Sequence, residues 1–325
     1  MSTHPASVFD GIPRPVDRRD FLRHVAWSSA GVVGALAAGA TASKVLGIEP
    51  IKRTGTSKFK FSLAAYSYRD LLTGKSGKPA ELSLEDFITD CAKMGLEGTE
   101  LTGYYFPSNP TPEYLRKIKE ITFRLGLDIS GTAIRNDFCY PSGPDWYREV
   151  QHVKRWVDYA DTMGAPVIRI FSGMPRGTSE AEAHRLAVAG FEETCDYAGQ
   201  HGIFLALENH GGLSTKVDDM LSLIRDVKSP WFAVNLDTGN FHTDDPYADL
   251  EKIAPYAMNV QVKVVIPDAK GNKRPSDYRR LAKILSDAGY RGYIVLEYEE
   301  AEDPRVACPK HMDQIRAGFL GHSQA

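Results

Sequence analysis

Four short apolar runs in the chain end on polar side chains: LALENH (205–210), VNLDTGN (234–240), NVQVK (259–263) and VLEY (295–298). Each run has the residue types of a buried strand. One such polar residue alone is better explained by helix capping or by pairing with Arg. Four on successive strands favour one shared divalent ion, because each buried polar group needs compensation. The candidate ligands are Glu208, Asp237, Gln261 and Glu297.

The rest of the chain alternates between strand-like and helix-like segments. Eight strand candidates begin near Phe61, Gly98, Asp128, Pro166, Ile203, Phe232, Met258 and Tyr293. Eight helix-period segments separate them, and several begin with a capping residue and end at Gly: 83–95, 111–126, 144–163, 179–202, 215–227, 247–253, 276–288 and 304–319. Eight βα units predict a single α/β domain, a (β/α)₈ TIM barrel over residues 58–325. The four candidate ligands then lie on its fifth to eighth strands, at the carboxyl ends where barrel enzymes place their active sites.

The N-terminal segment is interpreted as an export signal. The stretch DRRDFLR (17–23) is a twin-arginine pattern, and an Ala/Gly-rich apolar run and a small-residue segment follow it. Residues 1–42 are therefore expected to be a twin-arginine signal peptide and residues 43–57 a linker, which predicts a periplasmic protein. An uncleaved N-terminal anchor stays open as an alternative.

Composition excludes several classes of protein. The net charge of -3, with 42% hydrophobic and 25% charged residues, is ordinary for a globular protein and shows no basic excess for binding nucleic acid. The four cysteines are scattered and form no C-x-x-C pair, so free buried thiols are expected. No membrane contact beyond the signal is expected. Assembly into a homo-oligomer is left open.

The four strand-ending segments, in this order and spacing, resemble the xylose-isomerase-like barrel superfamily of sugar phosphate isomerases and epimerases. That group includes ketose 3-epimerases, inosose dehydratases, hydroxypyruvate isomerase and a DNA-repair endonuclease branch. The resemblance covers residues 58–320 and implies a small carbohydrate as the substrate. It also implies a metal held by Glu208, Asp237, Gln261 and Glu297. Gln261 stands where relatives have His. An all-oxygen set favours one Mn²⁺ or Mg²⁺ ion over Zn²⁺.

The resemblance also implies a mechanism. A metal ion stabilises the enediolate that forms when a proton next to a carbonyl is removed, with Glu208 and Glu297 exchanging the proton. Lys263, on the same strand face as Gln261, is expected to polarise the carbonyl or neutralise an oxyanion, and a structural pair with a carboxylate stays open as its alternative. Arg169 is expected to balance the acidic site. Substrate-binding candidates are Asn209, His210, Asn240, His242, Tyr66, Tyr104 and Arg135. Among Tyr66, Tyr68, Tyr104 and Tyr105, near the first strands, at least two are expected to pack in the barrel instead.

Three functions remain open at this point. The first is an isomerase or epimerase of a keto- or aldo-sugar. The second is a lyase or dehydratase that removes the same proton and then expels a β-substituent, for example the aglycone of a 3-keto-glycoside. The third is a non-catalytic sugar-binding barrel. The endonuclease branch is disfavoured, because it needs further His ligands and a basic face.

Overall fold

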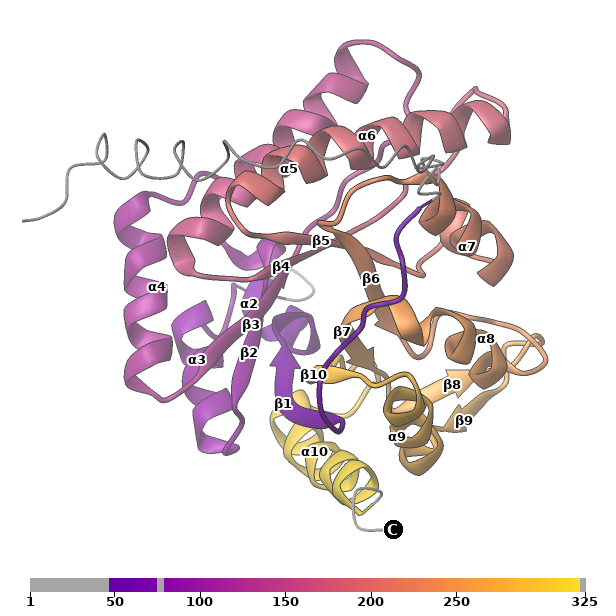
Figure 1. Ribbon diagram of the computed structural model, residues 1–325. Coiled ribbons are helices and arrows are strands. Elements are labelled where there is room, and N and C mark those ends of the chain that lie inside the picture. Colours follow the sequence, from indigo (N-terminus) through magenta and orange to yellow (C-terminus); the bar gives the residue numbers. More distant parts are fainter. Residues whose placement is uncertain (1–46, 75–78, 322–325) are drawn as a thin grey trace, which may run out of the picture. The chain divides into compact units, whose positions relative to one another are not determined.

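The computed structural model describes residues 47–74 and 79–321 (Figure 1). The predicted signal peptide, residues 1–42, and the first part of the predicted linker lie outside the described residues.

Eight parallel strands close into a barrel in the order β1-β10-β7-β6-β5-β4-β3-β2. Neighbouring strands are also neighbours in the sequence, apart from the closing pair β1 and β10 and from a small hairpin inserted after β7, as expected for repeated βα units. The predicted TIM barrel is therefore confirmed. The strands are β1 (Lys58–Ala64), β2 (Gly98–Thr102), β3 (Asp128–Ala133), β4 (Val167–Ile170), β5 (Phe204–Glu208), β6 (Phe232–Asp237), β7 (Ala257–Val262) and β10 (Arg291–Leu296).

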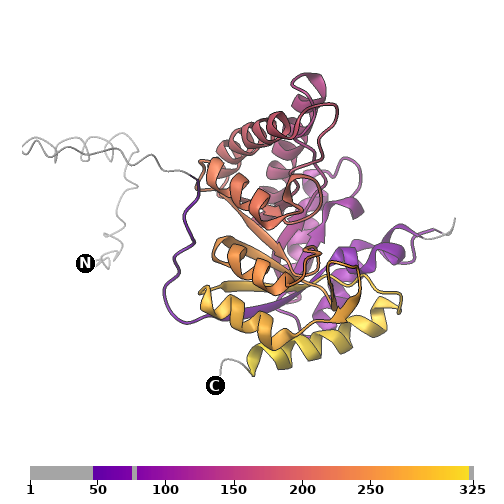
Figure 2. The same ribbon diagram turned by 90° about the vertical axis from the view of Figure 1, so that its right-hand side faces the viewer.

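Helices surround the strands (Figures 1 and 2). They are α2 (Arg69–Thr73), α3 (Leu84–Lys93), α4 (Pro112–Arg124), α5 (Pro144–Met163), α6 (Glu180–Gln200), α7 (Val217–Asp226), α8 (Pro246–Ile253), α9 (Tyr278–Asp287) and α10 (Pro304–Leu320). Capping residues fix several of their starts: Ser83 and Asp86 form a capping box at α3, and the side chains of Thr111 and Ser179 cap α4 and α6. These starts agree with the sequence predictions to within one residue.

Three of the strand-like runs change to another structure before they end. After β1 and β2 the chain turns into the 3-10 helices η1 (Ala65–Tyr68) and η2 (Gly103–Tyr105). The run from Met258 to Ile266 also breaks: β7 stops at Val262, and β8 (Val265–Pro267) pairs antiparallel with β9 (Lys273–Pro275) outside the barrel. The break follows from local bonding, because the Lys263 backbone N–H donates to Thr238 Oγ1 and the Lys263 carbonyl accepts from Ser276 Oγ.

The apolar core lies between the strands and the helices. Tyr68 is buried there and its ring packs edge-on against Phe87, with ring centroids 5.2 Å apart, so for Tyr68 the packing interpretation is confirmed. All four cysteines are free and buried, as predicted. Among residues 47–74 and 79–321, no helix has the length and apolarity that crossing a bilayer requires.

The described part of the predicted linker, residues 47–57, contacts the barrel. The backbone N–H of Ile48 donates to the carbonyl of Ile224 in α7, and that of Ile51 donates to the carbonyl of Pro255 in η4 (Ala254–Tyr256). Figure 2 shows this segment running along the outside of the barrel before it enters β1. The chain therefore contacts the domain well before the first strand.

Candidate active site

Three acidic residues gather where neighbouring strands end. Glu208 ends β5, Asp237 ends β6 and Glu297 directly follows β10, and all three are buried. Lys263 follows β7, which lies between β6 and β10 in the barrel. We call these four residues the charged cluster. It forms because parallel strands bring their carboxyl ends to one face of the barrel.

Lys263 connects the carboxylates of this cluster. Its Nζ atom donates to Glu297 Oε2 and lies 3.3 Å from Asp237 Oδ2 and 3.1 Å from Glu299 Oε2. The other Asp237 oxygen, Oδ1, accepts a bond from the Gly239 backbone N–H at 2.8 Å. The ammonium group thus lies between two buried carboxylates, with Glu299 as a third and more exposed partner.

A second cation holds Glu208. Arg169 on β4 is buried, and its Nε lies 2.9 Å from Glu208 Oε2 in a charge contact without aligned hydrogen-bond geometry. Arg169 also donates to the Ile134 carbonyl at 2.8 Å, and Asn240 Nδ2 donates to Glu208 Oε1 at 3.0 Å. The expectation that Arg169 balances the acidic site is confirmed by this geometry.

Burial and the two cations set the charges of the cluster. Burial raises the pKa of Glu208 to about 7 and that of Asp237 to about 8, although Arg169 and Lys263 act against it. Burial acts on Glu297 too, but Lys263 and Arg169 outweigh it and hold the Glu297 pKa below its usual value. Burial opposes charge on Lys263 as well, and the carboxylates Asp237 and Glu297 raise its pKa well above normal. Lys263 and Glu297 therefore form a charged pair.

Gln261 belongs to a different layer of the barrel interior. Its Oε1 accepts a bond from Asn235 Nδ2, and its Nε2 donates to Glu100 Oε1, both at 2.7 Å. Asn259 Nδ2 donates to Glu100 Oε2 and to Asn235 Oδ1, both at 2.8 Å. We call these four residues the amide network. Burial raises the pKa of Glu100 to about 7.

The residues do not fit the four-ligand metal site predicted from the sequence. The Gln261 amide is bonded at both ends within the amide network, and the Lys263 ammonium contacts two of the other three predicted ligands. Within residues 47–74 and 79–321, no cluster of three or more His, Cys, Asp or Glu side chains is arranged to hold a metal ion. The bound Mn²⁺ or Mg²⁺ ion stays a prediction that metal analysis of the protein tests.

A cavity of about 330 Å³ opens beside the charged cluster. Lys263, Glu297 and Glu299 line it together with Asn240 and His242. This volume suits a small polar molecule. A small molecule in this cavity would lie next to the Lys263–Glu297 pair and to the Asn240 amide that bonds Glu208.

The two predicted binding residues after β5 have other contacts. Asn209 accepts from the Asp237 backbone N–H at 2.8 Å and donates to the Asp237 carbonyl at 2.9 Å, which ties the ends of β5 and β6 together. His210 lies against the Phe171 ring, with ring centroids 4.6 Å apart, and burial lowers its pKa. Asn209 thus positions Asp237, and burial favours the neutral form of the His210 imidazole.

The predicted aromatic and cationic residues form a neighbouring group. The rings of Tyr66 and Tyr104 meet edge-on at 6.3 Å, and the Arg135 guanidinium lies 5.8 Å from the Tyr104 ring centroid. Tyr104 reaches the charged cluster through its hydroxyl, 3.4 Å from the guanidinium of Arg169. None of the three lines the cavity beside Lys263, so their binding roles stay predictions.

Sequence reasoning missed Glu100 and Glu299. Glu100 is a carboxylate in the middle of the strand run GTELT (98–102), and an acidic residue inside a fully buried strand was the available signal. Glu299 lies two residues beyond Glu297. Alternate residues of an extended chain lie on the same face, so the position of Glu299 two residues after Glu297 was the available signal.

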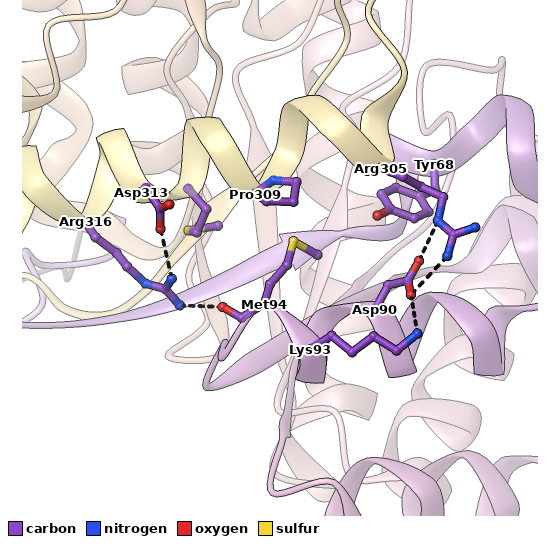
Figure 3. A pocket seen from close by; sticks show the side chains of 9 residues that line it. Tyr68, Asp90, Lys93, Met94, Arg305, Pro309, Asp313 and Arg316 are labelled. Carbon is purple, nitrogen blue, oxygen red and sulfur yellow. Dashed lines mark hydrogen bonds and ion pairs between the residues drawn. The ribbon is translucent and has the colours of Figure 1, made fainter.

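Another cavity, of about 380 Å³, lies in the outer helical layer between α3 and α10 (Figure 3). Its charged side chains are already paired: Asp90 contacts Arg305 and Lys93, and Arg316 donates to the Met94 carbonyl. It contains none of the predicted site residues, so the cavity at the strand ends is the better candidate.

Known proteins resemble this chain over most of its length. An inosose dehydratase from Serratia proteamaculans is 24% identical over 274 residues, which are 70% of this chain and 86% of that protein. The structure of an L-ribulose 3-epimerase superposes with a TM-score of 0.66 at 16% identity, covering 82% of this chain and 96% of the other. The D-psicose 3-epimerase from Clostridium cellulolyticum H10 gives 0.64 at 15% identity, covering 82% and 98%.

The two structural matches, at these identities, show a shared fold alone. The family model described as xylose isomerase-like TIM barrel matches residues 88–317, which include β2 to β10 and every member of the charged cluster. The chain therefore belongs to the xylose isomerase-like TIM barrel family.

Proposed function

We propose that the chain is an enzyme that isomerises or epimerises a small carbohydrate by removing a proton from the carbon next to a carbonyl group. One observation carries the proposal: Glu297 and Lys263 pair beside a cavity of about 330 Å³ at the carboxyl ends of the strands, next to Glu208. This face carries the chemistry in TIM-barrel enzymes. The relatives named as 3-epimerases of L-ribulose and D-psicose support a sugar as the substrate.

Each residue has a role in this reaction. Glu297 lines the cavity as a carboxylate and accepts the proton, and Glu208, held by Arg169 and Asn240, returns a proton to the other face of the carbon. Asp237 positions the Lys263 ammonium group through their ion pair. Asn240 and His242 contact substrate hydroxyl groups from the cavity wall.

A second candidate is a dehydratase or lyase. The match to an inosose dehydratase favours it specifically, since that relative is named for the loss of water from an inosose. Its first step is the same proton removal, and the two reactions part only when the enediolate expels a β-substituent instead of taking a proton back. The charged cluster serves both outcomes.

Incubation in D₂O with a panel of keto-sugars, inososes and 3-keto-glycosides tests the proposal. Deuterium is expected to enter the recovered sugar at the carbon next to the carbonyl. A rearranged sugar identifies an isomerase or epimerase, and an unsaturated product with released water or aglycone identifies a lyase. Binding of sugars without exchange or reaction across the panel would instead support a non-catalytic sugar-binding barrel.

We further propose that the N-terminal segment directs export by the twin-arginine route. The support is the DRRDFLR pattern alone, since it lies outside the described residues. Expression with Arg18 and Arg19 both changed to Lys is expected to stop export. N-terminal sequencing of the exported form then separates a cleaved signal from an uncleaved anchor.

A further inference from the structure

We propose that the Lys263 ammonium takes the place of the divalent cation in this chain, so that the enediolate is stabilised by a lysine and the enzyme works without a metal. This inference rests on the proposed function for its chemistry. Its structural basis is the position of Nζ, which contacts Glu297 and lies 3.3 Å from Asp237. A metal held by these two carboxylates would have to occupy the same place.

The backbone around Lys263 fixes its side chain in that place. The Lys263 N–H donates to Thr238 Oγ1 at 2.9 Å, and its carbonyl accepts from Ser276 Oγ at 2.6 Å. The stem runs over Gly239, where an added Cβ would lie only 2.6 Å from Lys263 Cγ. Gly239 therefore leaves the space that the lysine stem fills, and Lys263 is held between the strand ends of β6 and β7.

Gln261 provides an independent observation. Asn259 and Gln261 of β7 and Lys263 just after it are every second residue, so they lie on the same face of the strand. Each step of two residues rises by about 6.6 Å. Gln261 is bonded at both ends to the amide network. Of these three residues, Lys263 therefore contacts the carboxylates of the charged cluster, and it brings a positive charge in place of a ligand atom.

Lys263 has a route to the substrate. Of its three carboxylate partners, Glu297 and Asp237 are buried, whereas the Glu299 side chain is 43% exposed and lines the cavity. A substrate oxygen can replace Glu299 as the third acceptor while the two buried contacts remain. The ammonium then donates a hydrogen bond to the substrate carbonyl oxygen.

The proton and electron balance closes without a further reactant. Glu297 takes the proton from the carbon next to the carbonyl, the C–H electron pair forms the carbon–carbon double bond, and the carbonyl π electrons move onto oxygen. The Lys263 N–H stabilises this oxyanion without giving up its proton. Returning a proton to the same carbon reverses the electron flow and completes an epimerisation. In an isomerisation, the proton of the neighbouring hydroxyl moves to the oxyanion while the former carbonyl carbon takes up the proton from the carboxylic acid.

The experiment uses the full-length protein after exhaustive treatment with EDTA. We expect metal analysis to find well below one ion per chain, and Mn²⁺, Mg²⁺ and Zn²⁺ to leave the melting temperature unchanged. We also expect proton exchange in D₂O to be the same with and without EDTA. About one bound ion per chain, or a melting temperature that rises with a divalent ion at micromolar concentrations, would overturn the inference.

Variants sharpen the test. Lys263→Met keeps the stem length and removes the charge, and it is expected to lower exchange by about 10² to 10³-fold, the effect of removing one oxyanion donor. Lys154→Met, which removes a lysine paired with Glu193 on the helical surface, is the matched control and is expected to keep full exchange. Lys263→Met that retains wild-type exchange overturns the inference. If Lys263→Met fails to fold, the metal content and melting temperature of the wild-type protein decide whether Lys263 replaces the metal ion.

The two proposals fail in different ways. If no substrate in the panel exchanges, with or without added Mn²⁺ or Mg²⁺, the proposed function fails, while metal analysis and melting still decide whether Lys263 excludes a metal. If exchange appears only when a divalent ion is added, the proposed function stands and the lysine inference is overturned.

Discussion

The barrel interior contains two layers of buried polar residues that differ in one respect. In the amide network, Glu100, Asn235, Asn259 and Gln261 bond to one another and both ends of the Gln261 amide are used. In the charged cluster, Glu297 and Lys263 pair but also line a cavity. A closed network stabilises the fold, whereas groups that keep a face toward a cavity are available for a substrate. Polarity alone therefore does not identify an active site.

The largest expected effect comes from Glu297→Gln. This change keeps the shape of the side chain and removes the base, and general base catalysis typically contributes about 10² to 10⁴-fold, so exchange in D₂O is expected to fall by that factor. Glu302→Gln, which removes an exposed contact with Lys310 and does not touch the cavity lining, is the matched control and is expected to keep activity. Wild-type exchange in Glu297→Gln would move the site away from the charged cluster.

Arg169→Met is expected to affect stability most. It leaves Glu208 buried without its cation, and breaking a buried pair by removing one partner typically costs about 3 to 5 kcal/mol. Urea unfolding measures the change. The double variant Arg169→Met with Glu208→Gln is expected to recover part of the loss, since no uncompensated charge remains. A double variant as unstable as the single one would show that Arg169 acts mainly through packing.

Gln261→Met tests whether the amide network contributes to stability and not to catalysis. It leaves the Asn235 amide and the Glu100 carboxylate short of partners, so a loss of about 1 to 3 kcal/mol in unfolding free energy is expected. Exchange per folded molecule and metal content are expected to match the wild type. A loss of bound metal in this variant would restore Gln261 to the ligand set predicted from the sequence.

The sequence predicted the barrel because eight apolar runs separated by capped helices leave few other folds. It also predicted which strand ends carry acidic residues, since that depends only on local spacing. It placed Gln261 with Asp237 and Glu297 in one ligand set and kept a pair between Lys263 and a carboxylate only as an alternative, whereas in the structure Lys263 contacts these two carboxylates. Both residues alternate onto the same face of β7, and their height relative to Asp237 and Glu297 depends on the register between strands far apart in the sequence. The β8–β9 hairpin was missed for a similar reason, because its first strand continues the apolar run of β7 without a break in composition.

The smallest effect is expected from Glu299→Gln, which probes the edge where the charged cluster meets the cavity. Glu299 is the exposed partner of Lys263, and exposed ion pairs contribute about 0 to 1 kcal/mol, so the unfolding free energy is expected to change little. If a substrate oxygen replaces Glu299 on Lys263, removing its charge lowers the competition for that N–H. KM is then expected to stay equal or fall, with kcat within about threefold of the wild type, since the transition-state contact to Lys263 is kept. A kcat about 10²-fold lower would show that Glu299 takes part in proton transfer. Glu299 would then belong to the reacting groups together with Glu297.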